Sequence, residues 1–351
     1  MVGSEGKSKV QLILRSFVLG LTVIVACAAV KSQKFGVESV RADIPKSQIS
    51  VNTGVFTNPL LLYTLGGHAA TIKSVAFSPN GRILATAGSE NDNRIGLWDT
   101  LTGKLVGIIR KAHRGAIQSL LISPDGKSLV SASNDNVINI WNLSDAKFSR
   151  SLVGHTSQVL SLAVSADSKV LASGAVDGIR VWDLLQQRPL ANLTRFDNAI
   201  YALAITPDGE TLVSGDNKGV IKLWNLSSGK LIRGFVGHSN AVSSLAFTPD
   251  GKTLVSASRD RTVKIWNLGS QRPIRTITAH NNWVNAIAIH PAGQTLASAG
   301  RDGIKLWNLN TGELVNTLGG HNDWVSSIAF SPDGSMFASG GFDRVIRVWR
   351  N

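Results

Sequence analysis

The chain of 351 residues contains a single cysteine, Cys27. One thiol excludes an intramolecular disulfide and any metal site built on paired cysteines. Clusters of basic charge are missing as well, because no run of lysine and arginine is longer than two residues. The formal charge of +13 is therefore dispersed over the surface. Such a charge gives a long-range attraction to acidic partners without selecting one of them.

Long apolar runs are also scarce, apart from the N-terminus. There, Lys7, Lys9 and Arg15 precede an apolar stretch from Phe17 to Val30. A basic start followed by a short apolar core and small residues is typical of an export signal. We predict that residues 1–27 are a signal peptide or membrane anchor, and that the polar residues 28–58 are a linker.

Three interpretations of this N-terminus stay open. The residues Ile24-Val25-Ala26-Cys27 resemble the lipobox of bacterial lipoproteins, in which Cys27 would become the lipid-bearing N-terminus. Residues 26–28 (Ala-Cys-Ala) fit an ordinary signal-peptidase site instead. In the third interpretation, residues 10–14 extend the apolar stretch into an uncleaved single span. All three place the rest of the chain outside the cytoplasm. The lipobox and the uncleaved span predict a membrane-associated protein, and ordinary cleavage predicts a secreted or periplasmic one. A cytoplasmic protein with an unusual N-terminus is the remaining alternative.

Seven tryptophans recur at intervals of 41 to 43 residues through the rest of the chain. Repeats of this length indicate propeller blades or helical solenoids. The local pattern decides between them, since residues 242–258 alternate apolar with small or polar residues around a Pro-Asp-Gly turn. No helical period of 3.6 residues occurs in these repeats, so each repeat predicts antiparallel strands. The tryptophans are Trp98, Trp141, Trp182, Trp224, Trp266, Trp307 and Trp349.

The Gly-His pair, the Asp of a strand-connecting turn and the terminal Trp of each unit resemble the WD-repeat family. The resemblance covers residues 59–351, although most units end in Trp-Asn instead of Trp-Asp. It implies an all-β, seven-bladed β-propeller with four-stranded antiparallel blades. The chain ends two residues after Trp349, so the last unit has only three strands. We expect residues 59–65 to supply the missing outer strand and close the ring, because a free sheet edge is a template for aggregation.

The resemblance also implies a hydrogen-bonded His-Ser-Asp-Trp tetrad in six of the seven repeats. Ser, His and Asp together invite a hydrolase interpretation, but six copies around a ring cannot all be active sites. We interpret them as structural groups that satisfy one another inside each blade. The six sets are His68, Thr86, Asp92 and Trp98; His113, Ser131, Asp135 and Trp141; His155, Ser173, Asp177 and Trp182; His238, Ser256, Asp260 and Trp266; His280, Ser298, Asp302 and Trp307; and His321, Ser339, Asp343 and Trp349.

Repeat four departs from this pattern. Phe196 takes the His position and Lys218 the Asp position, while Ser214 and Trp224 remain. The two replaced groups are the pair that would bond each other, and losing both avoids leaving one unpaired. We expect apolar packing of Phe196 to hold this blade and the blade to be looser than the others.

Enzymatic chemistry is not expected elsewhere in the chain. The seven innermost strands offer almost no His, Asp or Glu that could converge on the central channel. His290 interrupts the series of Ser-Pro-Asp-Gly and Thr-Pro-Asp-Gly turns, but a lone His is a poor metal site. We therefore predict no catalytic residue, no metal and no cofactor.

Binding is expected on the face that carries the loops after each Gly-His pair. Aligning the repeats gathers Trp, Arg and Phe side chains there over repeats five, six and seven. Aromatic residues and Arg are the types that dominate binding energy at interfaces, and an Arg over a Trp ring adds cation–π attraction. The alternative is that these Trp side chains merely cover their blades. The candidate partner-binding residues are Arg259, Trp283, Asn285, Arg301, Trp324 and Phe342.

The function predicted from these features is a non-enzymatic, exported and membrane-tethered scaffold, monomeric as a propeller. Its partner would be a protein, with an acidic or aromatic-anchored peptide as the docked segment. The alternative is a sensor module that binds a small ligand or polysaccharide in or over the central channel, with the Trp rings as stacking platforms. Single-stranded nucleic acid would use similar chemistry, but an exported protein seldom meets it.

Overall fold

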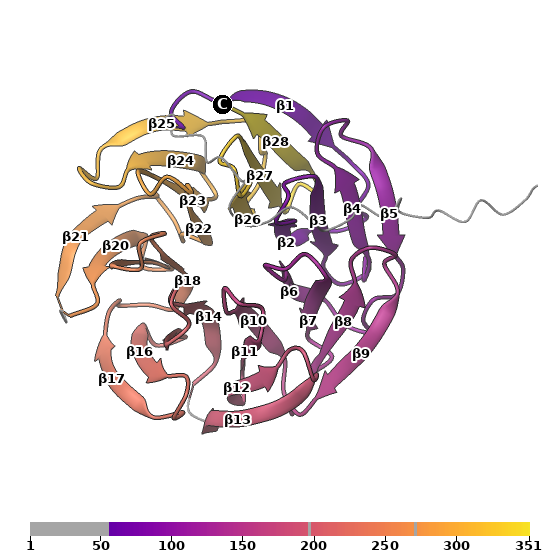
Figure 1. Ribbon diagram of the computed structural model, residues 1–351. Helices are drawn as coiled ribbons and strands as arrows, with labels where there is room; N and C mark the ends of the chain where they lie inside the picture. The colour runs from indigo at the N-terminus through magenta and orange to yellow at the C-terminus, as the bar shows by residue number, and fades with distance from the viewer. Residues whose placement is uncertain (1–55, 196–197, 270–271) are drawn as a thin grey trace, which may run out of the picture. The chain divides into compact units, whose positions relative to one another are not determined.

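The computed structural model describes residues 56–195, 198–269 and 272–351. Within these ranges the chain forms 28 strands in seven four-stranded antiparallel sheets. The sheets stand side by side around a central axis, as blades of one ring (Figure 1). The predicted all-β, seven-bladed propeller is confirmed. In the same ranges, no helix is long and apolar enough to cross a membrane. The predicted signal or anchor, residues 1–27, lies outside the described residues.

Each blade runs from an innermost to an outermost strand. Blades one to three contain β2 (Ile72–Phe77), β3 (Ile83–Gly88), β4 (Ile95–Asp99) and β5 (Leu105–Ile109); β6 (Ile117–Ile122), β7 (Ser128–Ser133), β8 (Val137–Asn142) and β9 (Phe148–Val153); and β10 (Val159–Val164), β11 (Val170–Ala175), β12 (Gly178–Asp183) and β13 (Arg188–Arg195).

The remaining blades follow the same order. Blades four to six contain β14 (Ile200–Ile205), β15 (Thr211–Asp216), β16 (Val220–Asn225) and β17 (Leu231–Val236); β18 (Val242–Phe247), β19 (Thr253–Ser258), β20 (Thr262–Asn267) and β21 (Pro273–Thr278); and β22 (Ala286–Ile289), β23 (Thr295–Gly300), β24 (Gly303–Asn308) and β25 (Leu314–Leu318). Blade seven contains β26 (Val325–Phe330), β27 (Met336–Gly341), β28 (Ile346–Arg350) and β1 (Leu60–Leu65).

The turn chemistry of the sequence sets the hairpins within a blade. In blade five, Gly251 has φ of +70°, a conformation that glycine adopts without a steric penalty. The hydroxyl of Thr248 donates to Asp250 and accepts the amide of Thr253. This network fixes the loop between β18 and β19 and therefore the register of the two strands.

The hydrophobic core lies between the blades, because both faces of each sheet are covered by its neighbours. One cluster joins Val255 and Ile265 of blade five to Leu296 and Trp307 of blade six, all at most 6% exposed. Similar clusters join the other neighbouring blades. Every blade is thus stabilised by the next, which requires the ring to be complete.

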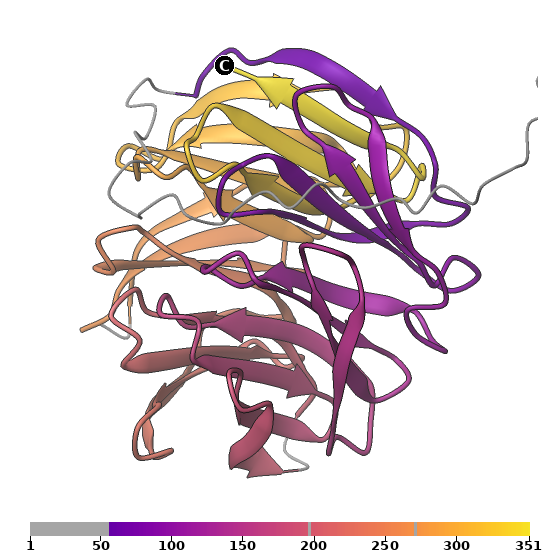
Figure 2. The same cartoon turned by 45° about the vertical axis from the view of Figure 1, so that its right-hand side comes forward.

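The ring closes as the sequence predicts. Strand β1 pairs antiparallel with β28, from Leu60 opposite Arg350 to Leu65 opposite Ile346. Both ribbon views show the indigo β1 alongside the yellow β28 at the outer edge of blade seven (Figures 1 and 2). The two ends of the propeller are therefore held in one sheet.

The packed structure begins before β1. Phe56, which the sequence placed in the linker 28–58, is fully buried, with its ring against Phe330 and Phe337 of blade seven and His290 of blade six. The amide of Asn316 donates to the carbonyl of Thr57 at 2.8 Å. The last residues of the predicted linker thus belong to the propeller, because an aromatic side chain fills the space between two blades.

We predict that Phe56→Ala destabilises the propeller by about 3 to 5 kcal/mol, the usual effect of emptying a buried aromatic site. The matched control is Phe148→Ala, since Phe148 packs edge-on against Trp141 but is 55% exposed. Urea unfolding followed by tryptophan fluorescence measures both variants. Equal losses in the two variants would show that Phe56 is not part of the core.

Candidate functional site

Two places in the propeller combine polar and aromatic side chains, and the first is inside the blades. In blade five, Nδ1 of His238 lies 2.8 Å from Asp260, and its Nε2 lies 2.7 Å from the hydroxyl of Ser256. The indole nitrogen of Trp266 donates to the same hydroxyl at 2.8 Å. These four residues come from the loop before β18, the turn after β19, and strands β19 and β20. The geometry links two strands, the turn between them and a loop of one blade through a continuous hydrogen-bonded chain.

Five other blades contain the same network. Their hydrogen bonds from the imidazole nitrogens to the hydroxyl and carboxylate groups measure 2.5 to 3.1 Å. The networks join His68, Thr86, Asp92 and Trp98; His113, Ser131, Asp135 and Trp141; His155, Ser173, Asp177 and Trp182; His280, Ser298, Asp302 and Trp307; and His321, Ser339, Asp343 and Trp349.

The direction of these bonds matches a catalytic triad, but the environment does not. Because the hydroxyl of Ser256 accepts from the indole, its proton is free to bond Nε2 of His238, and Nδ1–H then faces Asp260. The Ser or Thr of all six networks is 0% exposed. No substrate can reach these oxygens, so the networks satisfy buried polar groups and position strands.

A basic side chain next to several networks went unnoticed in the sequence. Lys264 donates to the carbonyl of Gly237, beside His238. Lys305 and Arg347 contact the Asp of their own blades at 3.0 and 3.1 Å. Each of these cations lies two residues before the terminal Trp, and that regular spacing is the signal that could have revealed them.

Burial and hydrogen bonding shift the titration of the networks. Burial lowers the pKa of His238, with Asp260 opposing the shift. Burial acts to raise the pKa of Asp260, but hydrogen bonds from His238 and Thr262 outweigh it and lower that pKa strongly. The neutral imidazole and the ionised carboxylate are therefore the forms that the fold stabilises at neutral pH.

Blade four replaces the network by a different one. The indole of Trp224 still donates to Ser214 at 3.0 Å. Asp216, which the sequence analysis passed over, is buried and accepts the amide of Asn198 at 2.8 Å and the backbone amide of Lys218 at 2.9 Å. A carboxylate thus still holds the turn after β15, from a position two residues earlier. Phe196, predicted to pack this blade, lies outside the described residues.

The second place is the mouth of the central channel. It is a cavity of about 340 Å³ on the face of the loops that follow the Gly-His pairs. Each of the seven blades contributes one equivalent residue to its wall, from its innermost strand or, in blade six, from just before that strand. None of the lining residues is acidic. They are Lys73, Gln118, Leu160, Tyr201, Ser243, Asn285 and Ser326, together with Arg259, Trp283, Trp324 and Phe342.

Cations and aromatic rings alternate around this mouth. The guanidinium of Arg259 lies between two rings, 4.9 Å from the centroid of Tyr201 and 4.7 Å from that of Trp283. The rings of Trp283 and Trp324 are 5.6 Å apart and tilted by 45°. Between blades seven and one, the ammonium of Lys73 lies 4.7 Å from the ring of Phe342.

The charges of Lys73 and Arg259 act on each other. Burial lowers the pKa of Lys73, and the positive charge of Arg259 lowers it further, against the weaker pull of Glu90. Repulsion between like charges and partial loss of hydration make this mouth a favourable place for a negative group.

The predicted patch is thus partly reproduced and partly rearranged. Arg259, Trp283, Asn285, Trp324 and Phe342 line the mouth, where the amide of Asn285 donates to the carbonyl of Val325 at 3.0 Å. Arg301 does not line it. It is exposed in the short turn between the paired residues Gly300 and Gly303.

Two residues that sequence reasoning missed are Lys73 of blade one and Tyr201 of blade four. They face Phe342 and Arg259, respectively. Their register position five residues after the His position was the available signal. The patch therefore extends beyond blades five to seven and surrounds the mouth.

Metal ligands do not gather at either place. Among the residues that the structure describes, no group of three or more His, Cys, Asp or Glu could hold an ion. His290 is buried, with Nδ1 accepting the amide of Ala292 and Nε2 facing the carbonyl of Gly334. These bonds assign the imidazole a structural role between blades six and seven.

Comparison with protein families shows that one family model matches every repeat of the chain. The family model described as "WD domain, G-beta repeat" matches seven consecutive segments, residues 60–99, 103–142, 146–183, 187–225, 229–267, 271–308 and 312–350. The chain belongs to the WD-repeat family. The matched segments cover nearly all of the propeller, including the atypical blade four.

Several proteins align with part of the chain, over 125 to 158 residues. The anaphase-promoting complex subunit cdh1 of Dictyostelium discoideum is 32% identical over 35% of this chain and 17% of its own length. The WD repeat-containing protein srw1 of Schizosaccharomyces pombe is 29% identical over 36% and 23%. The apoptotic protease-activating factor 1 of Rattus norvegicus is 26% identical over 45% and 12%. The chain thus aligns with less than a quarter of each of these relatives.

We predict that Ser256→Ala, which orphans both an imidazole and an indole of this WD-repeat protein, destabilises it by about 1 to 3 kcal/mol. The matched control is Ser214→Ala, because the Phe at position 196 has no group to bond the lost hydroxyl. Ser214→Ala should cost less. Unfolding midpoints in urea measure both, and an equal cost would argue against a cooperative tetrad.

The lowered histidine pKa values predict a loss of stability in mild acid. The imidazoles of His68, His155, His238, His280 and His321 titrate lower in the fold than in the unfolded chain. The unfolded state therefore binds more protons below about pH 6.5, which favours unfolding.

The urea midpoint should consequently stay level from pH 8 to 7 and fall from pH 7 to 5. Protonation of the paired carboxylates, whose pKa values are also lowered, should add a second loss below about pH 4. A midpoint that is constant between pH 7 and 5 would contradict this account of the networks.

Proposed function

We propose that this WD-repeat protein is a non-enzymatic scaffold that docks a partner protein over the mouth of its central channel. The observation that carries the proposal is the arrangement of Arg259 between Tyr201 and Trp283 in a mouth without acidic side chains. Aromatic and Arg side chains that are held in place before binding lose little conformational entropy on association.

The chemistry of the mouth favours a segment with acidic and aromatic side chains. A carboxylate between Lys73 and Arg259 would relieve the repulsion that these cations exert on each other. An aromatic side chain of the partner could stack on the exposed ring of Trp283, which is 43% accessible. The names of the relatives agree with a protein partner, since one is called a subunit of the anaphase-promoting complex.

A small anionic ligand or a polysaccharide is the second candidate. The tilted pair of Trp283 and Trp324 offers two neighbouring ring faces, on which a sugar could stack. The cavity of about 340 Å³ is within the usual range for small-molecule sites. If such a ligand occupies the mouth instead of a protein, replacing the two Trp residues would not change which proteins the chain captures in a pull-down.

We further propose that residues 1–27 export the chain and attach it to a membrane, through a lipid on Cys27 or through an uncleaved span. Support for this comes from the basic start and apolar core of the segment. The mass of the mature N-terminal peptide tests it in the native host. A lipid-modified Cys27 identifies a lipoprotein and an intact Met1 an uncleaved segment. A start at Ala29 would indicate ordinary cleavage and no tether.

The docking proposal predicts that the double variant Trp283→Ala, Trp324→Ala loses specific proteins from a pull-down in the native host. The loss should be about tenfold or more, as expected for truncating two hot-spot residues. The matched control is Phe148→Ala with Ile232→Ala, which removes two exposed apolar side chains from outer strands. Equal thermal stability of both variants must be established first.

The outcomes separate the two candidates. If the control keeps the partners and the Trp variant loses them, the mouth is a protein-docking site. If both variants keep them, the Trp rings are not needed for docking and the proposal fails. Binding of oligosaccharides to the wild-type chain alone, measured by the fluorescence of Trp283 and Trp324, would support the second candidate.

A further inference from the structure

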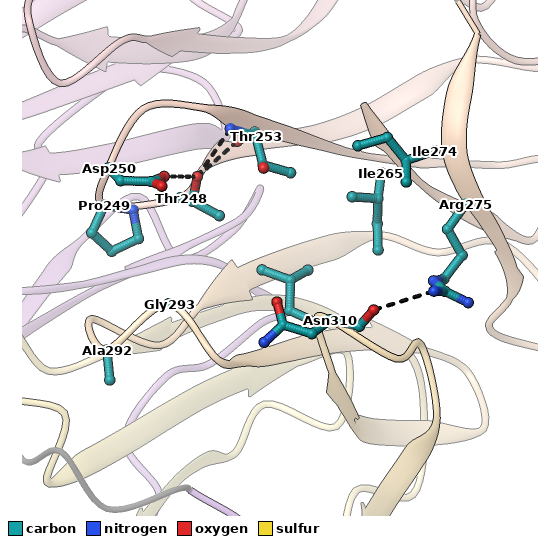
Figure 3. A pocket seen from close by; sticks show the side chains of 11 residues that line it. Thr248, Pro249, Asp250, Thr253, Ile265, Ile274, Arg275, Ala292, Gly293 and Asn310 are labelled. Carbon is teal, nitrogen blue, oxygen red and sulfur yellow. Dashed lines mark hydrogen bonds between the residues drawn. The ribbon is translucent and has the colours of Figure 1, made fainter. Parts of the chain in front are cut away.

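Two cavities of the propeller differ in whether their polar groups are bonded within the protein. In the groove between blades five and six, which encloses about 370 Å³, the hydroxyl of Thr248 donates to Asp250 at one end. At the other end, the guanidinium of Arg275 donates to the carbonyl of Asn310 at 3.2 Å, as Figure 3 shows. The buried side chain of Leu309 packs between the two blades. Both ends of this groove are thus bonded within the propeller.

At the channel mouth, the neutral polar side chains are bonded in the same way. Gln118 donates to the side chain of Asn134 at 3.0 Å. The hydroxyl of Ser243 donates to the carbonyl of Val284. Together with the bond of Asn285 described above, these contacts leave the neutral groups of the mouth with protein partners. The free hydrogen-bonding capacity of the mouth therefore lies elsewhere.

The two cations of the mouth carry that capacity. Among the residues that the structure describes, the side chains of Lys73 and Arg259 form no hydrogen bond and no ion pair, although both line the cavity. Their contacts are with ring faces, of Phe342 for Lys73 and of Tyr201 and Trp283 for Arg259. A guanidinium that lies over a ring still has its N–H groups directed outward in its own plane. The rings thus fix the cations without using their donors.

The electrostatics of the mouth specify the charge of a ligand. A group that enters meets two positive charges and no acidic side chain among the residues that line the cavity. Burial lowers the pKa of Lys73, and the charge of Arg259 lowers it further. A negative group relieves both effects, whereas an amino terminus would be repelled. The geometry points to a carboxylate that accepts the unused N–H groups.

The shape of the mouth favours the end of a chain over its middle. Residues of all seven blades surround the cavity, and its volume of about 340 Å³ is near the lower end of the usual range for small-molecule sites. An internal segment would have to enter and leave through the same ring of side chains. A terminus enters once, so it needs less space for the same contacts.

We propose that the channel mouth binds the C-terminus of a partner protein whose last residue is aromatic. The terminal carboxylate accepts hydrogen bonds from Lys73 and Arg259, and the side chain of the same residue stacks on the exposed ring of Trp283. Capture of a chain terminus by fixed donors is an established mode of peptide recognition. This inference rests on the proposed docking function and narrows it from a segment to a chain end.

The test uses the full chain and three acetylated peptides, with binding measured by calorimetry. The first peptide, Gly-Ser-Gly-Ser-Phe, ends in a free carboxylate, and the second is the same sequence with a terminal amide. The third, Gly-Ser-Asp-Phe-Gly-Ser with a terminal amide, has its carboxylate on an internal side chain. The first should bind about tenfold or more tighter than the other two, the gain expected from charge-assisted hydrogen bonds. Inorganic phosphate is the probe for a small free anion.

Two protein variants show where the carboxylate binds. Arg259→Asn and Lys73→Gln introduce the residues that blade two has at these register positions, Asn134 and Gln118. Each variant should lose most of the preference for the acid over the amide, while the amide binds as before. The matched control is Arg301→Asn, because Arg301 has the register position of Arg259 but does not line the mouth. The control should keep the full preference, and thermal unfolding checks that all three variants are folded.

Several results would overturn the proposal, and the peptide comparison on the wild-type chain needs no variant. Equal binding of the acid and the amide, or no saturable binding of the acid, contradicts it directly. Equal binding of the peptide with the internal Asp would assign the mouth to an acidic side chain, and tighter binding of phosphate would assign it to a small anion. An equal loss in Arg301→Asn and Arg259→Asn would indicate general charge attraction.

These failures can be told apart from a failure of the docking function. If the Trp283→Ala, Trp324→Ala variant loses its partner proteins while the acid and the amide bind equally, the mouth docks a protein without holding its C-terminus. If that variant keeps its partners, the docking function itself fails, whatever the peptides do.

Discussion

Closure of the ring is the constraint on which the other features depend. The pairing of β1 with β28 ties the two ends of the propeller into one blade. Because the core lies between blades, a missing outer strand would weaken the contacts on both sides of blade seven. Phe56 extends this closure from backbone hydrogen bonds to side-chain packing. The fixed ring in turn holds one residue from each blade at the channel mouth.

The buried networks explain how a uniform frame can carry varied surfaces. In six blades the same four residue types satisfy one another, which fixes the loop after the Gly-His pair and the turn that carries the Asp. The positions three and five residues after the His are free to differ, and they supply Trp283, Trp324 and Lys73. Blade four shows that the frame tolerates an exchange when another buried carboxylate, Asp216, holds the same turn.

The repeat period made the fold predictable. Features that do not repeat from blade to blade could not be predicted in the same way. The Trp spacing and the strand-like residues 59–65 predict the blades and their closure correctly. Phe56 belongs to no repeat, so no alignment of repeats could show that it is buried. At the channel mouth, register identified Trp283 and Arg259, but their partner Tyr201 comes from a neighbouring blade. Arg301 holds the same register position as Arg259 but does not line the mouth, because the turn in blade six is one residue shorter than the turn in blade five.

The construction of the ring favours a scaffold over a switch. The channel mouth is built from equivalent residues of all seven blades. Coupling between this mouth and a distant part of the propeller would need an element with two alternative arrangements. A closed ring of sheets, each buried between two neighbours and held by hydrogen-bonded turns, resists such a rearrangement. A partner bound at the mouth would therefore meet a rigid frame, and its binding would have little effect on the rest of the propeller.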